Sequence, residues 1–194
     1  MRLASLLLSL LLVPQLVAAQ ETQAPATTGP STRVRVVTTA GNFVIELDHN
    51  RAPRTVDAFL KYVKEGFYSG LIFHRVVAGF IAQAGGYTVD LTPKDVKENI
   101  INESGNGLSN LRGTVGMARS TEPHSATSQF YVNLADNVDL NPRPTRWGYA
   151  VFGKVVEGME VVDDIGHRPT AGGGPFDRNV PVEPISIERI EIVE

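Results

Sequence analysis

Residues 73–86 bring together side chains that could act on a peptide bond without forming a covalent intermediate. Arg75 supplies a permanently charged guanidinium and Gln83 supplies a side-chain amide, and both lie among large apolar residues such as Phe80 and Ile81. The apolar residues could hold a nonpolar ring of a bound peptide, while the guanidinium donates hydrogen bonds to its amide. The segment contains no evident nucleophile, so the pattern favours chemistry by hydrogen bonding alone.

Strand parity predicts which polar side chains can meet, because residues two apart in a strand share a face. Phe73, Arg75 and Val77 are therefore expected on one face of a first strand. By the same rule, Gln129 and Tyr131 share one face of a later strand, and the apolar residues next to Tyr131 point into the core. Arg75, Gln129 and Tyr131 could then line a common groove on the outside of the sheet.

The rest of the chain predicts a scaffold of short strands with two helices. Apolar and polar residues alternate over 33–38 and again over 43–47, with a turn between them, which predicts a hairpin. After Pro53, apolar residues recur at i, i+3, i+4 and i+7 from Val56, and Gly66 can end this amphipathic helix. Further strands are expected at 71–77, 80–83, 114–118, 129–134, 150–155 and 185–192, a second helix at 158–165, and mainly loop at 87–111. This pattern predicts a mainly β fold, an antiparallel barrel plugged by helices.

The first residues have the layout of a secretory signal. One arginine precedes an apolar run at 6–13, and small residues at 17–19 form a cleavage site, so residues 1–19 are expected to be a signal peptide. Residues 20–32 are rich in Thr, Ala and Pro and are interpreted as a flexible linker before one folded domain at 33–194. No other segment is long and apolar enough to cross a bilayer, so no membrane anchor is expected.

Composition argues against several classes of function. The chain has no cysteine, which removes disulfides, catalytic thiols and thiolate metal sites. Its four histidines show no close pairing and no acidic ligand spacing, so no metal site is expected, and His74 is interpreted as a packed, hydrogen-bonded residue beside Arg75. The formal net charge of −3 argues against nucleic acid or an anionic membrane as the main partner.

The motifs at residues 73–86, 128–133 and 148–155 together resemble the cyclophilin family of peptidyl-prolyl cis-trans isomerases, in particular its bacterial exported branch. The resemblance runs from about Arg33 to the C-terminus. It implies an eight-stranded antiparallel β-barrel closed by two α-helices, which agrees with the element pattern of the sequence.

The resemblance also implies a site, carried over position by position. Arg75 is expected to be the catalytic cation. The walls of the proline pocket are expected to be Phe80, Ile81, Tyr131 and Leu140. The peptide groove is expected to be lined by Gln83, Ala118, Arg119, Ser120 and Gln129, with Tyr149 beside them. The resemblance implies no metal and no cofactor.

Several of these positions depart from the residues common in the family. Tyr131 replaces a phenylalanine and Tyr149 replaces a histidine, so the pocket gains two hydroxyls. Arg119 replaces an asparagine whose role is largely through its backbone, and Asp139 stands before Leu140 where many members carry a pocket tryptophan. The pocket is therefore expected to differ from that of the best-known members.

We expect a monomeric, cofactor-free peptidyl-prolyl cis-trans isomerase that is exported to the periplasm and assists the folding of exported proteins. Its partners would be proline-containing unfolded or partly folded polypeptides. An alternative from a different class stays open at this point, namely a chaperone module that binds proline-containing segments without significant turnover. The sequence separates the two poorly, because a groove that binds is also required for one that catalyses, but the presence of Arg75 favours the enzyme.

Overall fold

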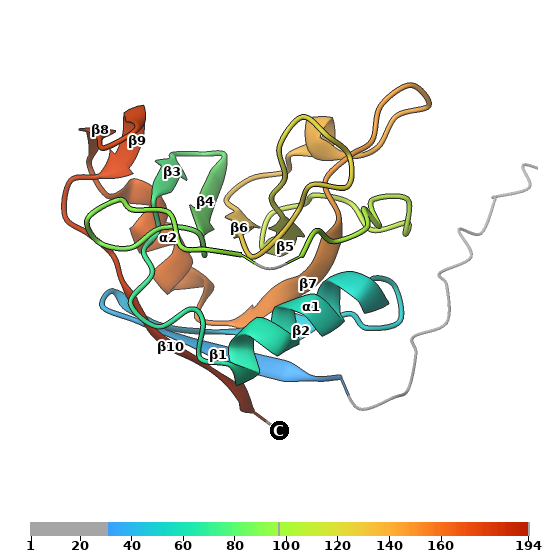
Figure 1. The fold of residues 1–194 in the computed structure, drawn as a ribbon, viewed down its shortest axis with the longest axis horizontal. Coiled ribbons are helices and arrows are strands. Elements are labelled where there is room, and N and C mark those ends of the chain that lie inside the picture. The colour runs from blue at the N-terminus through green and yellow to red at the C-terminus, as the bar shows by residue number, and fades with distance from the viewer. Residues whose placement is uncertain (1–30, 97, 194) are drawn as a thin grey trace, which may run out of the picture.

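The computed structural model describes residues 31–96 and 98–193, and its main element is an eight-stranded sheet (Figure 1). Every neighbouring pair of strands in this sheet is antiparallel. In spatial order the strands are β10 (Ile187–Val193), β1 (Arg33–Thr38), β2 (Gly41–Leu47), β7 (Val151–Glu157), β5 (Thr114–Met117), β6 (Phe130–Asn133), β4 (Ile81–Ala84) and β3 (Arg75–Val77). The mainly β, eight-stranded antiparallel class predicted from the sequence is confirmed.

The sheet curls, and backbone hydrogen bonds connect the chain just before its two edge strands, β3 and β10. The N–H of Phe73 donates to the C=O of Ile185 at 2.9 Å, and the N–H of Ile187 donates to the C=O of Leu71 at 2.7 Å. These bonds satisfy main-chain groups that an open edge would leave unpaired.

The helix α1 (Pro53–Lys64) begins with proline in its first turn, where the missing N–H costs nothing. The residue before it offers no side-chain cap. Glu103, from a distant loop, supplies one instead, because its carboxylate accepts hydrogen bonds from the main-chain N–H groups of Arg54 (3.1 Å) and Thr55 (2.8 Å). Gly66, at φ +66, follows the end of the helix in the left-handed conformation that the sequence predicts.

Aromatic rings fill the space between α1 and the sheet. The ring centroid of Phe59 lies 5.5 Å from Phe130 on β6, 5.2 Å from Phe152 on β7 and 5.3 Å from Tyr68. Edge-on and tilted ring pairs of this kind stabilise a core beyond the area that they bury. The apolar face of α1 therefore closes one side of the curled sheet.

The second helix, α2 (Met159–His167), packs on β2, β3 and β4. It begins after Gly158, which adopts φ +76, and it adds the fully buried Val162 and Ile165 to the core. The helix predicted at 158–165 is confirmed, with a shift of one or two residues at each end.

The strand predicted at 71–77 is regular only over β3. Phe73 and Val76 both belong to the buried core, so the alternation of faces slips between them. The expectation that Phe73 shares a face with Arg75 is therefore wrong, because the backbone between them does not keep a continuous two-residue period.

The sequence pattern does not predict the two-stranded sheet of β8 (Thr170–Gly173) and β9 (Phe176–Pro181), which lies beside β3 (Figure 1). Residues 172–174 are three consecutive glycines, and apolar and polar residues do not alternate around them, so the pattern typical of a strand is missing. A short 3₁₀ helix, η1 (Val138–Leu140), is likewise not predicted.

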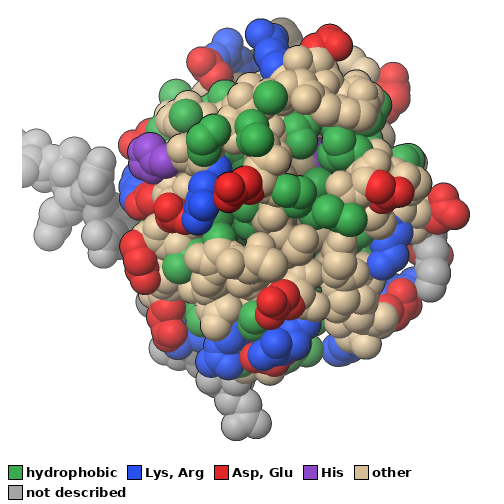
Figure 2. Space-filling view, turned by 90° about the vertical axis from the view of Figure 1, so that its left-hand side faces the viewer, with side chains coloured by type: hydrophobic (Ala, Val, Ile, Leu, Met, Phe, Trp, Pro, Cys, Tyr) green, Lys and Arg blue, Asp and Glu red, His purple; other side chains and the backbone are tan. Residues whose placement is uncertain are grey.

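The expected signal peptide at residues 1–19, and residues 20–30 of the expected linker, lie outside the described residues. Within the described ranges, no helix is long and apolar enough to cross a membrane. On the face shown in Figure 2, apolar side chains lie in small groups among Lys, Arg, Asp and Glu, a mixture that is ordinary for a protein surface.

Candidate functional site

The turn between β3 and β4 builds the first part of the site. Gly79 adopts φ +67, which favours glycine, and the N–H of Phe80 donates to the C=O of Val77 at 2.9 Å. The resulting register places Arg75 directly opposite Gln83. The structure therefore brings together the guanidinium and the amide that the sequence singles out.

A row of three polar side chains crosses β3, β4 and the start of β6. Arg75 Nη1 donates to Gln83 Oε1 at 3.3 Å, and Gln83 Nε2 donates to Gln129 Oε1 at 2.9 Å. Gln129 lies against Gly86, where a Cβ would come within 2.5 Å of its Nε2. Each side chain is thus oriented by its neighbour in the row.

Arg75 presents a half-buried positive charge. Burial lowers the pKa of its guanidinium, Tyr149 acts in the opposite direction, and the positive charge of Arg178 lowers it further. The guanidinium still remains protonated at neutral pH, because arginine titrates far above it. Among the described residues no carboxylate forms an ion pair with Arg75, and its Cζ lies 5.9 Å from the ring centroid of Phe80. The cation is therefore available to an electron pair on a ligand.

Tyr131 occupies the outer side of β6, since Phe130 and Val132 lie in the core as strand parity predicts. The side chain is nevertheless only 2% exposed. Its hydroxyl donates to Asn110 Oδ1 at 2.6 Å, and burial raises its pKa. On the opposite strand β5, a Cβ at Gly116 would approach the Tyr131 ring to 2.3 Å, so the glycine makes room for the ring.

Tyr149 stands beside Tyr131, with the ring centroids 6.1 Å apart and nearly perpendicular. The Cζ of Arg119 lies 4.6 Å from the centroid of the Tyr149 ring. The same guanidinium donates to the C=O groups of Trp147 at 2.7 Å and Gly148 at 3.1 Å, and to those of the two residues that follow it at 2.8 and 3.3 Å. The side chain of Arg119, and not only its backbone, therefore connects residues 120–121 with residues 147–148 and packs against the Tyr149 ring.

Leu140 and Ile81 complete the set expected around the pocket. Leu140 ends η1, and its C=O accepts a hydrogen bond from the N–H of Tyr149 at 2.9 Å. Ile81 is 4% exposed and lies on the same side of β4 as Gln83, because the two alanines that alternate with them belong to the core. Ile81 therefore provides apolar surface next to the polar row, and the backbone of Leu140 is attached to Tyr149.

Ala118 and Ser120 are less closely connected to the rest. The N–H of Ala118 donates to the C=O of Gln129 at 2.9 Å, which fixes its backbone beside the polar row. Ser120 is exposed, and its N–H and hydroxyl both bind Ser125 Oγ, at 3.0 and 2.7 Å. Ser120 therefore lies at the rim.

His74 is buried beside Arg75, as expected from its parity. Its ring packs against Tyr87 at 4.6 Å and Phe176 at 5.7 Å between centroids, and its Nδ1 has no hydrogen-bond partner among the described residues. Burial lowers the pKa of His74 to about 4, so the ring is neutral at physiological pH. The neutral ring cannot serve as a second cation in the site.

A group of buried asparagines lies behind these residues, and two of its members, Asn110 and Asn137, are not predicted from the sequence. Asn133 Nδ2 donates to Asn110 Oδ1 at 3.2 Å, while Asn137 Nδ2 donates to Asn133 Oδ1 and to the C=O of Phe80, both at 2.8 Å. A signal existed, because a buried amide needs partners whether it belongs to Gln83 or to an asparagine. Residues 87–111 are predicted mainly as loop, so a buried position is not expected for Asn110.

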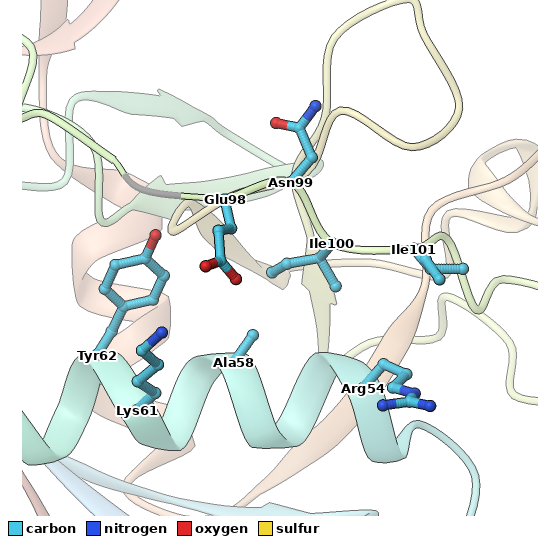
Figure 3. A pocket seen from close by; sticks show the side chains of 8 residues that line it. All are labelled: Arg54, Ala58, Lys61, Tyr62, Glu98, Asn99, Ile100 and Ile101. Carbon is cyan, nitrogen blue, oxygen red and sulfur yellow. The ribbon is translucent and has the colours of Figure 1, made fainter.

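Two cavities lie elsewhere on the molecule. One, of about 380 Å³, separates α1 from residues 98–101 and is lined by side chains such as Tyr62, Lys61 and Glu98; Glu98 points toward α1 (Figure 3). Another, of about 430 Å³, lies under residues 142–147. Neither is lined by a residue of the polar row.

Comparison with known proteins identifies the family of the chain. Residues 33–192 match the family model described as cyclophilin type peptidyl-prolyl cis-trans isomerase/CLD. The chain is 49% identical over 164 residues to peptidyl-prolyl cis-trans isomerase A of Dickeya dadantii, an alignment that covers 84% of this chain and 86% of the relative. It is 46% identical over 160 residues to peptidyl-prolyl cis-trans isomerase B of Escherichia coli, covering 81% and 97%.

Solved structures give the same result. A cyclophilin type peptidyl-prolyl cis-trans isomerase of Cryptosporidium parvum superposes with a TM-score of 0.71 at 25% identity, covering 84% of this chain and 98% of that one. A crystal structure of the same parasite protein in the presence of the dipeptide Ala-Pro gives a TM-score of 0.70 at 26% identity, covering 84% and 99%.

Proposed function

This chain belongs to the cyclophilin-type peptidyl-prolyl cis-trans isomerase family, and we propose that its reaction takes place on the outer surface of β3, β4 and β6, with Arg75 as the catalytic cation. Its substrates are proline-containing polypeptides. One observation carries the assignment: the Arg75 guanidinium is half-buried, lies beside Phe80 and is bound by the neutral Gln83 instead of a carboxylate.

The reaction requires little covalent chemistry. Amide resonance opposes rotation about the peptide C–N bond with a barrier of roughly 18–20 kcal/mol. As the bond turns, resonance is lost, and the prolyl nitrogen becomes pyramidal and gains a lone pair. An N–H of Arg75 directed at this lone pair stabilises the twisted amide more than the planar one, which is the condition for catalysis.

The cation cannot account for the whole rate. Shortening an isomerisation from about ten seconds to about a millisecond lowers the barrier by roughly 5.5 kcal/mol. A charge-assisted hydrogen bond contributes about 1.5–3 kcal/mol. The remainder would come from holding the proline ring in an apolar pocket and excluding the water that favours the planar amide.

The other expected residues support this chemistry in two ways. Gln83 and Gln129 orient the cation and offer amide groups to the peptide backbone, and Ala118, Arg119 and Ser120 border the groove. The pocket for the proline ring is formed by Phe80, Ile81, Tyr131, Leu140 and Tyr149. The burial of Ile81 and Tyr131, the ring contact of Tyr131 with Tyr149 and the hydrogen bond from the N–H of Tyr149 to the C=O of Leu140 support the assignment.

We propose in addition that the protein acts on exported polypeptides in the periplasm, as a monomer. The support is the signal-like pattern at residues 1–19, followed by a linker at 20–32 and a domain at 33–194. Expression of the full chain in a bacterium tests this proposal. We expect the protein in the periplasmic fraction, with residue 20 as the mature N-terminus by mass spectrometry; full-length protein retained in the cytoplasm would contradict it.

Exchange NMR spectroscopy on a short peptide with one Ala-Pro bond tests the site, because it reports turnover and binding separately. Arg75→Ala should lower kcat/KM about 100-fold, or roughly 2.7 kcal/mol, while the peptide Kd changes less than about threefold. Arg75→Lys keeps the charge but loses the planar fork, so we expect partial activity. A folded Arg75→Ala variant with full turnover would rule out the role of Arg75, whereas binding without turnover by the unmodified protein would support the chaperone alternative.

A further inference from the structure

We propose that Asn110 is the positioning residue of the proline pocket, because its one amide group ties together Tyr131, the segment that carries Leu140, and the backbone of Tyr149. Three of the pocket walls then depend on a single side chain that is fully buried in a loop. The inference rests on the proposed function, since it takes these walls to bind the proline ring.

The carbonyl side of the Asn110 amide faces β6. Its Oδ1 accepts hydrogen bonds from the Tyr131 hydroxyl at 2.6 Å and from Asn133 Nδ2 at 3.2 Å. Asn133 has a second acceptor in Thr114 Oγ1 at 2.9 Å, whereas Asn110 is the one partner of the Tyr131 hydroxyl within the described part of the chain. Loss of Oδ1 would therefore leave a buried hydroxyl unsatisfied, which is more costly than losing an exposed hydrogen bond.

The donor side of the same amide faces the loop that follows β6. Asn110 Nδ2 donates to Asn141 Oδ1 at 3.1 Å and to the C=O of Tyr149 at 3.3 Å. The main chain of Asn110 adds two bonds, from its N–H to Asn141 Oδ1 at 2.8 Å and from the N–H of Asn137 to its C=O at 2.7 Å. Asn137 and Asn141 flank η1, so both ends of the segment that carries Leu140 are attached to Asn110.

The sheet gives the Tyr131 ring no alternative position on its other side. The ring already fills the space in which a Cβ of Gly116 would lie, 2.3 Å away. A ring that loses its anchor at Asn110 must therefore move away from Gly116, which changes its contact with the Tyr149 ring. Such a movement changes the shape of the pocket without touching Arg75.

The hydrogen bond between the Tyr131 hydroxyl and Asn110 predicts that one substitution has opposite effects in two backgrounds. A phenylalanine at position 131 needs no acceptor, but in the unmodified protein Tyr131→Phe removes the hydrogen bond to Asn110 that holds this wall of the pocket, so it should weaken peptide binding by itself. In a protein that lacks the Asn110 amide, the same change should be beneficial, because it removes the unsatisfied hydroxyl. A purely structural role for Asn110 gives no such reversal in the affinity for substrate.

The experiment compares Asn110→Ala, Tyr131→Phe and the double variant in the Ala-Pro peptide assay, with the peptide Kd measured by chemical-shift titration. Asn106→Ala is the matched control. Its side chain also bonds within this loop, to the C=O of Val151 at 2.9 Å and to the N–H of Leu108 at 3.0 Å, but it contacts none of the pocket residues. Melting temperatures of all four variants report the stability that each change costs.

We expect Asn110→Ala to raise KM and the peptide Kd about fivefold or more, with kcat lowered less than about threefold. Tyr131→Phe by itself should raise the peptide Kd about twofold to fourfold, and the double variant should recover at least half of the affinity lost in Asn110→Ala on a logarithmic scale. Asn106→Ala should lower the melting temperature and leave KM unchanged. The proposal is overturned if a folded Asn110→Ala keeps its KM, or if Tyr131→Phe weakens its affinity further.

Two further outcomes are decided in advance. Where Asn110→Ala does not fold, Asn110→Ser takes its place, and failure of both to fold while Asn106→Ala folds would show a structural role and overturn the proposal. Failure of the proposed function is visible separately, as full turnover in Arg75→Ala. The Kd values of the Asn110 and Tyr131 variants do not depend on turnover and still decide whether Asn110 positions the pocket.

Discussion

On the outer face of β1, β2 and β10, most polar side chains are charged and at least partly exposed, whereas on β4 and β6 they are neutral and largely buried. The pair Arg35 and Glu191 faces each other in register across β1 and β10, with a 3.1 Å contact and side-chain exposures of 43% and 36%. The equivalent pair on the other half is Gln83 and Tyr131, opposite each other on β4 and β6, and Tyr131 is 2% exposed. One sheet therefore carries two kinds of outer surface.

The difference follows from what each surface must do. Exposed ion pairs keep the sheet hydrated and contribute little to stability, because water and salt screen them. Buried neutral amides and hydroxyls fix side chains in one geometry, since an unmade hydrogen bond is costly there. Arg75 belongs to the second surface, where neutral partners hold it in place without neutralising its charge.

The largest predicted effect concerns His74, the buried ionisable ring next to Arg75. Its folded pKa of about 4 lies below the ordinary value of about 6.5, so the unfolded chain binds the proton first. The contribution of neutral His74 to the free energy of unfolding should therefore be fully present above pH 6.5, and about 3 kcal/mol of it should be lost as the pH drops toward 4. Urea unfolding from pH 7 to pH 4.5 measures this, and His74→Phe should remove that part of the slope; parallel curves for both proteins would contradict the prediction.

The next effect tests the space that the buried surface reserves for Tyr131. Gly116→Ala places a Cβ about where the Tyr131 ring lies, so we expect a loss of about 2 kcal/mol of stability and at least a tenfold lower kcat/KM. The matched control is Gly105→Ala, since no other group lies within 4 Å of a Cβ at that position and the backbone is not left-handed. Thermal melts and the peptide assay compare the two, and equal behaviour would show that the ring can move aside.

A smaller effect tests the row of Arg75, Gln83 and Gln129. Gln83→Ala removes the amide that holds the guanidinium, so kcat/KM should fall about fivefold to tenfold, or about 1 kcal/mol. In the Arg75→Ala background the same change should add little, because the two residues act as a unit. Full additivity of the two losses in the peptide assay would argue that Gln83 acts independently.

The smallest effect is expected on the ionic surface. Arg35→Ala and Glu191→Ala should each change stability by about 0.5 kcal/mol or less, with a coupling energy in that range and no change in kcat/KM. A double-mutant cycle in low and moderate salt measures the coupling. A value above about 1.5 kcal/mol would remove the distinction between the two surfaces.

The sequence predicts most of the fold because its periods are local and regular. The hairpin of β1 and β2, both helices and the strands β5, β6, β7 and β10 follow from alternation or from a helical period, and the eight-stranded antiparallel architecture follows from the family resemblance. The β8 and β9 pair is missed because Gly172 and its neighbours carry no pattern. The face on which Phe73 lies is predicted wrongly because the residue types do not reveal the break in strand alternation before Arg75.

The site is predicted in part for the same reason. Arg75 and Gln83 could be paired because a tight turn fixes their register, and Gln129 follows from parity. The roles of Asn110 and of the Arg119 side chain could not be read in advance, since each depends on loops that meet only after folding. Local periodicity contains no information about such contacts between loops.

The pairing of β1 with both β2 and β10 has a consequence for how the chain is made. Arg33 pairs with Val193, so β10, one partner of the first strand β1, leaves the ribosome about 160 residues later than β1. At about 5–20 residues per second, this delay is roughly 10–30 seconds, during which the growing chain holds one edge of its first hairpin open. The newly made chain therefore passes through an interval in which this open strand edge can pair with other chains and aggregate.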